Sequence, residues 1–209
     1  MVVIGVTGGV GTGKSAVAGM FKRLGAVVLD ADTLAHQSME PKRLAWRSIV
    51  RAFGDKVLND DQTVNRRRLA EVVFRDEALR HRLEAIIHPQ VLREIRRQLG
   101  RLRRQHRIRA VVLDVPLLLE VGAQRLADAV VVVTASSQAQ RERLAARDGW
   151  STEEMTARIG AQWELSAKEA LADYVVDNSD GVERTRTQVK RIWNQLVPAS
   201  SRSSSTSRR

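Results

Sequence analysis

The stretch Gly8-Gly9-Val10-Gly11-Thr12-Gly13-Lys14-Ser15 comes one residue after the apolar run Val2-Val3-Ile4-Gly5-Val6. It fits the phosphate-loop pattern G-x-x-x-x-G-K-[ST], together with the strand that must precede that pattern. Its glycines let several backbone N–H groups turn toward one anion, which a Cβ would obstruct. A helix predicted from about residue 15 to 24 directs its positive N-terminal end at the same anion. Lys14 then reaches the β- and γ-phosphates and the Ser15 hydroxyl binds Mg²⁺, so the stretch predicts a nucleoside triphosphate site.

The composition limits the class of protein. The 209 residues are 43% hydrophobic, enough for one good-sized core, and with 4% aromatic residues that core must consist of Val, Leu, Ile and Ala. The chain has no cysteine, which excludes disulfides and thiolate metal sites. A strand starts at once, leaving no room for a signal peptide, and no apolar run approaches the length of a membrane span. We expect a cytoplasmic protein without a membrane partner, monomeric or weakly homo-oligomeric.

The formal net charge of +11 has two local sources. Residues 93–109 contain eight arginines opposed by Glu94 alone, and residues 200–209 contain only Ser, Arg and Thr. We expect segment 198–209 to be a disordered tail, because it cannot bury apolar surface. Nucleic-acid binding is one interpretation of such charge. We favour a solvated face, with no specific nucleic-acid partner, because charge runs alone are weak evidence and residues 75–149 contain no aromatic residue for base stacking.

Apolar runs alternate with helical stretches along the chain. Runs at residues 27–29, 110–113, 129–133 and 174–176 follow the first strand and are typical of buried parallel strands. Residues 138–147 form one predicted helix between these runs, and a capping box at Ser151 opens the next. Residues 182–196 follow the last run and have apolar residues at helical spacing. We therefore expect an α/β protein of the phosphate-loop (P-loop) NTPase fold. Its five-stranded parallel sheet is flanked by helices, and ligands bind at the carboxyl ends of the strands.

One connection is too long for a simple crossover. Almost eighty residues separate Asp32 from Arg109 without a convincing strand, and residues 43–53, 66–74, 77–87 and 90–104 all have helical character. Loops of this length are normally functional, so we expect a helical substrate-binding insertion at residues 34–107. The nucleotide-binding core then comprises residues 1–33, 108–136 and 172–197, and a helical lid comprises residues 137–171.

Acidic residues follow two of the predicted strands. Asp30 and Asp32 point the same way if the chain stays extended, so both can face the phosphate loop. One of them can instead cap the following helix, and we favour Asp32 as the functional residue because it lies farther beyond the strand. Asp114 ends the third strand, where a carboxylate commonly anchors Mg²⁺, although it can also accept backbone N–H bonds. We favour the metal role, since an unpaired carboxylate is costly to bury.

Basic residues after the fourth strand suit phosphoryl transfer. Arg143 and Arg147 share one helix face, and with Arg141 they can neutralise charge on the transferring phosphoryl group or remain solvated. His88-Pro89 begins the long basic helix in our interpretation, with His88 by default a capping or packing residue. A switch GTPase is excluded, because residues 114–117 lack the D-x-x-G turn and no N-K-x-D motif occurs.

The chain resembles the dephospho-coenzyme A kinase family over residues 1–197. The matching pieces occur in family order, and together they are specific: Val6-Thr7-Gly8-Gly9-Val10-Gly11-Thr12-Gly13-Lys14-Ser15, Leu29-Asp30-Ala31-Asp32, Phe53-Gly54, Arg66 with Leu69 and Phe74, Ile87-His88-Pro89, Asp114-Val115-Pro116-Leu117-Leu118-Leu119-Glu120, Arg143, Arg147, Gln162 and Asp177-Asn178-Ser179. The resemblance implies transfer of the ATP γ-phosphate to the ribose 3′-hydroxyl of dephospho-coenzyme A. Another nucleotide or nucleoside kinase, or a nucleic-acid-binding ATPase, remains the alternative.

The resemblance also implies roles for individual residues. Asp32 corresponds to the general base, and Lys14 and Arg143 to charge-stabilising groups. ATP is the cofactor, with Mg²⁺ held by Ser15 and Asp114. The residues implied to bind ATP are Gly9, Val10, Gly11, Thr12, Gly13, Lys14, Ser15, Ala16, Arg147 and Asn178. Those implied to bind dephospho-coenzyme A are Thr7, Asp32, Arg66, His88, Pro89, Leu117, Leu118 and Glu120.

Overall fold

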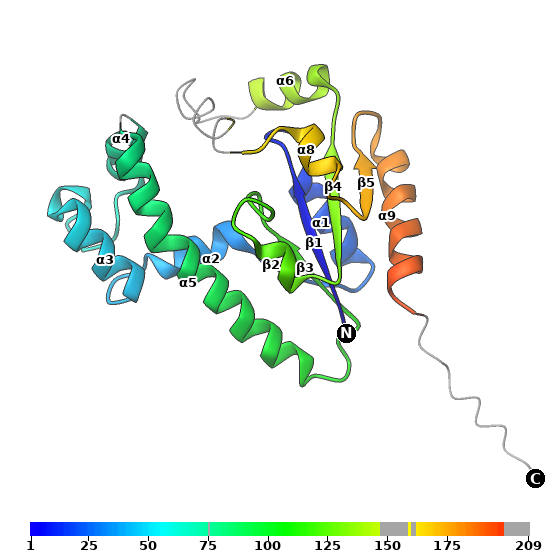
Figure 1. The fold of residues 1–209 in the computed structure, drawn as a ribbon, viewed down its shortest axis with the longest axis horizontal. Helices are drawn as coiled ribbons and strands as arrows, with labels where there is room; N and C mark the ends of the chain where they lie inside the picture. The colour runs from blue at the N-terminus through cyan, green and yellow to red at the C-terminus, as the bar shows by residue number, and fades with distance from the viewer. Residues whose placement is uncertain (75, 147–158, 160–161, 199–209) are drawn as a thin grey trace, which may run out of the picture.

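A five-stranded parallel sheet forms the centre of the computed structural model, which describes residues 1–74, 76–146, 159 and 162–198 (Figure 1). The strand order is β2-β3-β1-β4-β5, and every neighbouring pair is parallel. The predicted strands are confirmed, and the later four extend one residue beyond the apolar runs: β1 (Val2–Gly8), β2 (Val27–Asp30), β3 (Ala110–Asp114), β4 (Ala129–Thr134) and β5 (Tyr174–Asp177).

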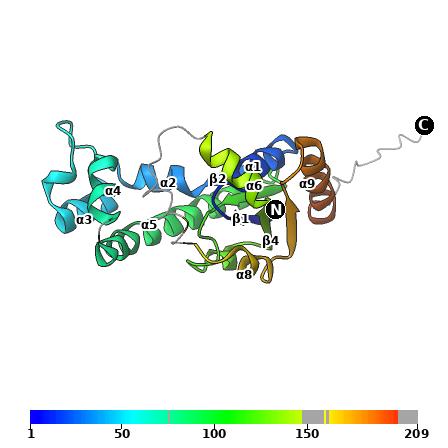
Figure 2. The same ribbon diagram turned by 90° about the horizontal axis from the view of Figure 1, so that it is seen from above.

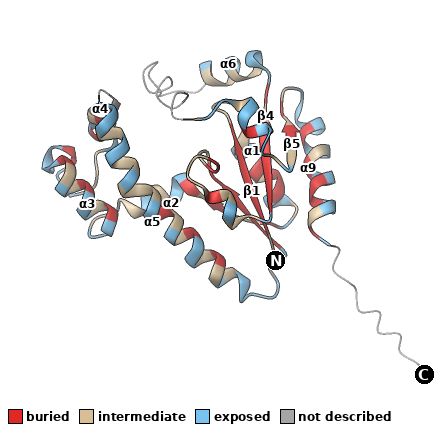
Figure 3. Ribbon diagram, viewed as in Figure 1, coloured by how far each residue is buried: buried red, intermediate tan, exposed pale blue. Residues whose placement is uncertain are grey.

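Helices cover both faces of the sheet. Alternate residues of a strand point to opposite faces, so in β1 Ile4 joins one hydrophobic core and Val3 joins the other. The first core lies under α1 (Lys14–Arg23) and α9 (Val182–Leu196), and the second lies under α2 (Ala31–Ser38), part of α5 (Glu77–Arg103) and α8 (Leu165–Glu169). The central strands β1, β3 and β4 are consequently buried on both sides, which explains their continuous apolar sequence, whereas the edge strands β2 and β5 are only partly buried (Figure 3).

The helical segment between β2 and β3 extends away from the sheet. α3 (Leu44–Phe53), the 3₁₀ turn η1 (Asp55–Val57), α4 (Arg66–Phe74) and the start of α5 share a third hydrophobic cluster built around Ile49 and Phe53. α3 and α4 therefore lie at one end of an elongated molecule, with α9 at the other (Figures 1 and 2). The second half of α5 returns to the sheet, where Val91, Ile95 and Leu99 pack in the second hydrophobic core.

Pro89 lies inside one continuous helix, which corrects our prediction of two helices. We expected helices at residues 77–87 and 90–104, with His88-Pro89 between them, but α5 spans both ranges. Proline removes one helical hydrogen bond and crowds the preceding turn, at a cost of about 3 kcal/mol. The two halves of α5 are anchored separately, by Leu83 in the helical cluster and by Ile95 on the sheet. This packing offsets the local preference for a break at proline.

The remaining elements complete the sheet and begin the predicted lid. The 3₁₀ turn η2 (Ala123–Leu126) precedes β4, and α6 (Ser137–Ala145) follows it with Ser136 as its N-cap. Most of the helix that we predicted from Ser151, and the tail from residue 199, lie outside the described residues. Over the described part of the chain, no helix has the length and apolar character needed to cross a membrane.

Candidate active site

The phosphate loop connects β1 to α1 and requires glycine at two crowded points. Gly13 is the N-cap of α1 with φ +84°, a left-handed conformation that residues with a Cβ rarely adopt. A Cβ at Gly13 would overlap Nδ2 of Asn178, and a Cβ at Gly8 would overlap the carbonyl oxygen of Val133. The first turn of α1 contains no acidic residue, so its positive N-terminal end is not neutralised locally. The loop therefore has the backbone and the electrostatics of an anion site.

Two side chains from distant segments hold the phosphate loop from outside. The buried Asn178 donates from Nδ2 to the carbonyl oxygen of Thr12 at 2.8 Å, and its Oδ1 accepts from the Thr185 hydroxyl at 2.9 Å. Arg143 of α6 donates to the carbonyl oxygens of Thr12 at 3.1 Å and Asn178 at 2.6 Å. The two residues fix the conformation of the loop at its entrance to α1.

Lys14, Asp114 and Ser15 meet at the adjacent strand ends. The Lys14 ammonium donates to Oδ1 of Asp114, and the Asp114 side chain is only 3% exposed. Burial raises the pKa of Asp114, while Lys14 opposes the rise and Asp30 adds to it. A hydrogen bond from Ser15 also lowers the pKa of Asp114. The predicted metal ligands Ser15 and Asp114 are thus neighbours, and the oxygen donors they offer are the kind that Mg²⁺ prefers.

Asp30 and Asp32 face different environments, which corrects our expectation for an extended chain. Asp30 is the N-cap of α2 and accepts from the N–H of Thr33 at 2.8 Å. Because α2 begins at Ala31, the chain turns helical between the two aspartates. Asp32 lies exposed in the first turn of α2 and lines the large cleft, whereas Asp30 lines a second cavity together with Ser15 and Asp114. Asp30 is therefore the capping residue, and Asp32 faces the phosphate loop.

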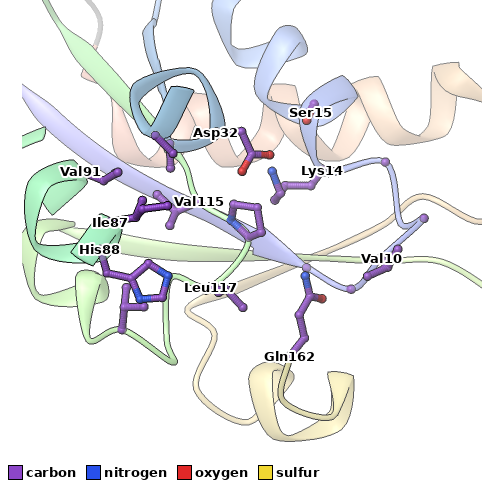
Figure 4. Close-up of a pocket in the computed structure, with 18 of the residues that line it drawn as sticks. Val10, Lys14, Ser15, Asp32, Ile87, His88, Val91, Val115, Leu117 and Gln162 are labelled. Carbon is purple, nitrogen blue, oxygen red and sulfur yellow. The ribbon is translucent and has the colours of Figure 1, made fainter. Parts of the chain in front are cut away.

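The large cleft has a volume of about 440 Å³ and joins the phosphate loop to the helical segment. One end consists of loop residues and the other of apolar side chains from α2, α5 and the chain after β3. Figure 4 shows Asp32 and Lys14 directed into this cleft, with His88 across it. The residues that line it are Gly8, Gly9, Val10, Gly11, Gly13, Lys14, Ser15, Ala16, Ala31, Asp32, Ala35, Ile87, His88, Val91, Leu92, Ile95, Val115, Pro116, Leu117, Val121, Arg143, Leu144 and Gln162.

This arrangement of phosphate loop, strand-end carboxylates and helical segment agrees with the comparison with known families. A family model for dephospho-CoA kinase matches residues 2–184. The chain belongs to the dephospho-CoA kinase family. A curated dephospho-CoA kinase of Symbiobacterium thermophilum is 46% identical over 193 residues, which cover 92% of this chain and 80% of that relative.

Several solved structures have a similar fold. A dephospho-CoA kinase from Campylobacter jejuni has a TM-score of 0.68 and 25% identity, covering 93% of this chain and 96% of that one. The Thermus thermophilus protein TT1252 has a TM-score of 0.78 and 32% identity, covering 94% and 98% of the two chains. A shikimate kinase from Bacteroides thetaiotaomicron, at 13% identity and a TM-score of 0.51, shares the fold alone. The predicted P-loop NTPase fold is confirmed.

The structure brings most residues predicted from the family resemblance to one cleft, but not all. Arg66 lies outside its lining, with Nη1 3.1 Å from Nε2 of His36. His88 is half-buried at the cleft, and burial lowers the pKa of its imidazole. Pro89 follows it on α5 and is exposed. Arg147 lies outside the described residues.

Three residues predicted to bind the acceptor lie behind the cleft wall. Thr7 is buried and donates from Oγ1 to the carbonyl oxygen of Pro116 at 2.9 Å. Leu118 is fully buried and packs in the sheet core. Glu120 is paired with Lys168, a fully buried lysine of α8 that our sequence reasoning missed. No local signal identifies it, because the short polar segment that contains Lys168 resembles a solvated helix.

Proposed function

We propose that this chain transfers the γ-phosphoryl group of ATP to the ribose 3′-hydroxyl of dephospho-coenzyme A, giving coenzyme A and ADP. This reaction is the last step of coenzyme A synthesis. The observation that carries the proposal is one cleft with the phosphate loop at one end, an apolar helical wall at the other and the Asp32 carboxylate between them. Membership of the dephospho-CoA kinase family supports the choice of acceptor.

The backbone N–H groups of the phosphate loop and the Lys14 ammonium bind the ATP phosphates in this proposal. The acceptor oxygen forms a bond to the γ-phosphorus, the bond from that phosphorus to the bridging oxygen breaks, and ADP leaves. Asp32 accepts the proton of the acceptor hydroxyl, since it lines the cleft and its carboxylate is exposed. Arg143 adds positive charge at the loop, where its hydrogen bonds to the carbonyl oxygens of Gly11 and Thr12 hold it.

Ser15 and Asp114 would hold Mg²⁺, which when bound neutralises charge on the phosphate oxygens. Within the described residues, no group of three His, Asp or Glu side chains forms a site for a metal ion. Proteins commonly bind Mg²⁺ through one or two side chains together with substrate phosphates and water, so a two-residue set fits this ion. We also infer a cytoplasmic location, where ATP is available as the phosphoryl donor.

The acceptor would lie along the wall formed by Ile87, His88 and Val91 of α5 and by Leu117. Arg66 and Pro89 belong to the same helical segment, and we propose that Arg66 contributes a cation for the acceptor phosphates.

Measurement of ATP consumption against a panel of hydroxyl acceptors tests the proposal. The panel contains dephospho-coenzyme A, adenosine, AMP, a pyrimidine nucleoside and shikimate, each with excess Mg²⁺. We expect turnover with dephospho-coenzyme A to exceed that with every other acceptor. Preferential turnover of a free nucleoside or nucleotide would replace the proposal with a different kinase activity. ATP hydrolysis stimulated by DNA, with no acceptor phosphorylated, would indicate a nucleic-acid-dependent ATPase.

A further inference from the structure

Lys168 is a charged side chain in the interior of the protein. Its exposed fraction is 0%, and its Nζ lies 2.8 Å from Oε1 of Glu120, which is itself 10% exposed. The same ammonium donates to the carbonyl oxygen of Pro116 at 3.2 Å. Lysine is almost never fully buried unless it is paired, because desolvation of the charge is costly. A lysine in this position therefore needs both acceptors.

The Glu120 carboxylate connects the pair to the backbone just before α8. Its Oε1 also accepts from the backbone N–H of Trp163 at 3.0 Å, while its Oε2 is buried without a hydrogen-bond partner among the described residues. The carbonyl oxygen of Pro116 accepts a second bond, from the Thr7 hydroxyl at 2.9 Å. One network thus joins the end of β1, the chain after β3 and the segment leading into α8.

Each of these three segments contributes to the cleft. Pro116 and Leu117 line it directly, and Gln162, the residue before Trp163, lines it from another side. Thr7 precedes the phosphate loop. Lys168 and Glu120 do not themselves line the cleft. Their hydrogen bonds instead set the position of the backbone that carries Leu117 and Gln162.

The phosphate loop has its own supports. Arg143 and Asn178 hold the carbonyl oxygen of Thr12, and neither residue contacts Lys168 or Glu120 by a hydrogen bond or ion pair among the described contacts. Loss of the Lys168–Glu120 pair should consequently displace the Leu117 and Gln162 walls more than the phosphate loop. The effect on the acceptor should then exceed the effect on ATP.

We propose that Lys168 and Glu120 are positioning residues for the acceptor, acting through Pro116 and Trp163 on the cleft walls. The inference rests on the proposed kinase function and names residues through which that site selects and orients dephospho-coenzyme A. The ion pair then makes two contributions, one to the stability of the fold and one to the binding of the acceptor. A buried ion pair can often be replaced by apolar side chains without loss of stability, so the two contributions can be measured apart.

The test compares Lys168→Met, Glu120→Gln and the double variant Lys168→Met/Glu120→Met with the wild type. Thermal unfolding gives stability, initial rates give KM for each substrate, and calorimetry gives the affinity for dephospho-coenzyme A. We expect Lys168→Met to unfold at a lower temperature, and the double variant to recover most of that loss. We expect KM and Kd for dephospho-coenzyme A to stay raised about tenfold or more in the double variant, with KM for ATP within about twofold.

Two further variants sharpen the result. Glu120→Gln keeps an acceptor for the Trp163 N–H and for Lys168, so its KM for the acceptor should rise less than that of the double variant. Lys190→Met removes an exposed lysine of α9 and should change neither constant. The positioning role is overturned if the double variant has raised KM values for ATP and acceptor alike. If the double variant does not fold, the same result in Glu120→Gln overturns it. The positioning role is also overturned if a folded double variant has the same KM for dephospho-coenzyme A as the wild type, because the pair would then have a structural role only. Absence of wild-type turnover with dephospho-coenzyme A would instead overturn the proposed function.

Discussion

Asp32→Asn and Asp30→Asn form a matched pair of substitutions, because each removes one carboxylate charge from the end of β2. Asp30 caps α2 through the Thr33 N–H, whereas Asp32 lines the cleft. Asparagine caps a helix about as well as aspartate, so Asp30→Asn should retain the cap. In Asp32→Asn, the acceptor hydroxyl loses its proton acceptor. We therefore expect a large loss of kcat from Asp32→Asn and a loss of only a few-fold from Asp30→Asn.

Substitutions at Asp32 and Asp30 should affect different free energies, the activation free energy in the first case and the free energy of unfolding in the second. Loss of a general base lowers kcat about a hundredfold or more, which corresponds to about 2.7 kcal/mol of transition-state stabilisation. Asp32 also lies in the first turn of α2, where a negative charge stabilises the helix by only about 0.3–1 kcal/mol. Asp30→Ala, by contrast, removes the cap and should cost about 1 kcal/mol, lowering Tm by about 2–4 °C. Asp32→Asn should therefore be inactive yet nearly as stable as the wild type, and Asp30→Ala less stable yet active.

The assay measures kcat with dephospho-coenzyme A at saturating ATP and Mg²⁺, with ATP and acceptor affinities measured separately by calorimetry. Both affinities should change little in Asp32→Asn. An active Asp32→Asn beside an inactive, folded Asp30→Asn would show that we have assigned the base to the wrong aspartate. Near-normal kcat in both variants would refute the view that a carboxylate at the end of β2 accepts the proton.

Lys14→Ala should lower turnover about a hundredfold or more, since it removes a charge contact to the phosphates; it also leaves the buried Asp114 without its cation. Lys14→Ala/Asp114→Asn should regain thermal stability but not turnover, and full turnover in folded Lys14→Ala would refute the role of the phosphate loop. Burial lowers the pKa of His88, so the unfolded state binds more protons as pH falls below about 6.5. Stability from the neutral imidazole is present above that pH and lost below it; His88→Gln should therefore lose less unfolding free energy between about pH 6.5 and 5 than the wild type. His106→Gln, at an exposed position, serves as the control, and equal pH profiles for wild type and His88→Gln would contradict the reasoning. Deletion of residues 200–209 should leave kcat unchanged, and loss of activity in a folded truncated chain would place the tail in the site or in an assembly.

Features that depend on residues close together along the chain could be predicted from the sequence. The glycines, Lys14 and Ser15 of the phosphate loop lie within eight residues, so their spacing from the preceding strand can be recognised in the sequence. Continuous apolar runs predicted the five strands, because a parallel sheet covered on both faces excludes polar side chains from its strands. The same patterns, with the family resemblance, predicted the kinase family that the comparisons show.

The roles of residues that are far apart along the chain depend on how the folded chain packs. The early start of α2 separated Asp30 from Asp32, which the extended-chain argument had placed together. Packing at both ends keeps α5 helical through Pro89, against the local preference for a break at proline. The buried Lys168 lies 48 positions from Glu120 along the chain. The residues adjacent to Lys168 in the sequence do not indicate that it is buried and therefore needs a charge partner. Burial and charge pairing are properties of segments brought together in space, and a sequence pattern reports only the preferences of residues that are close along the chain.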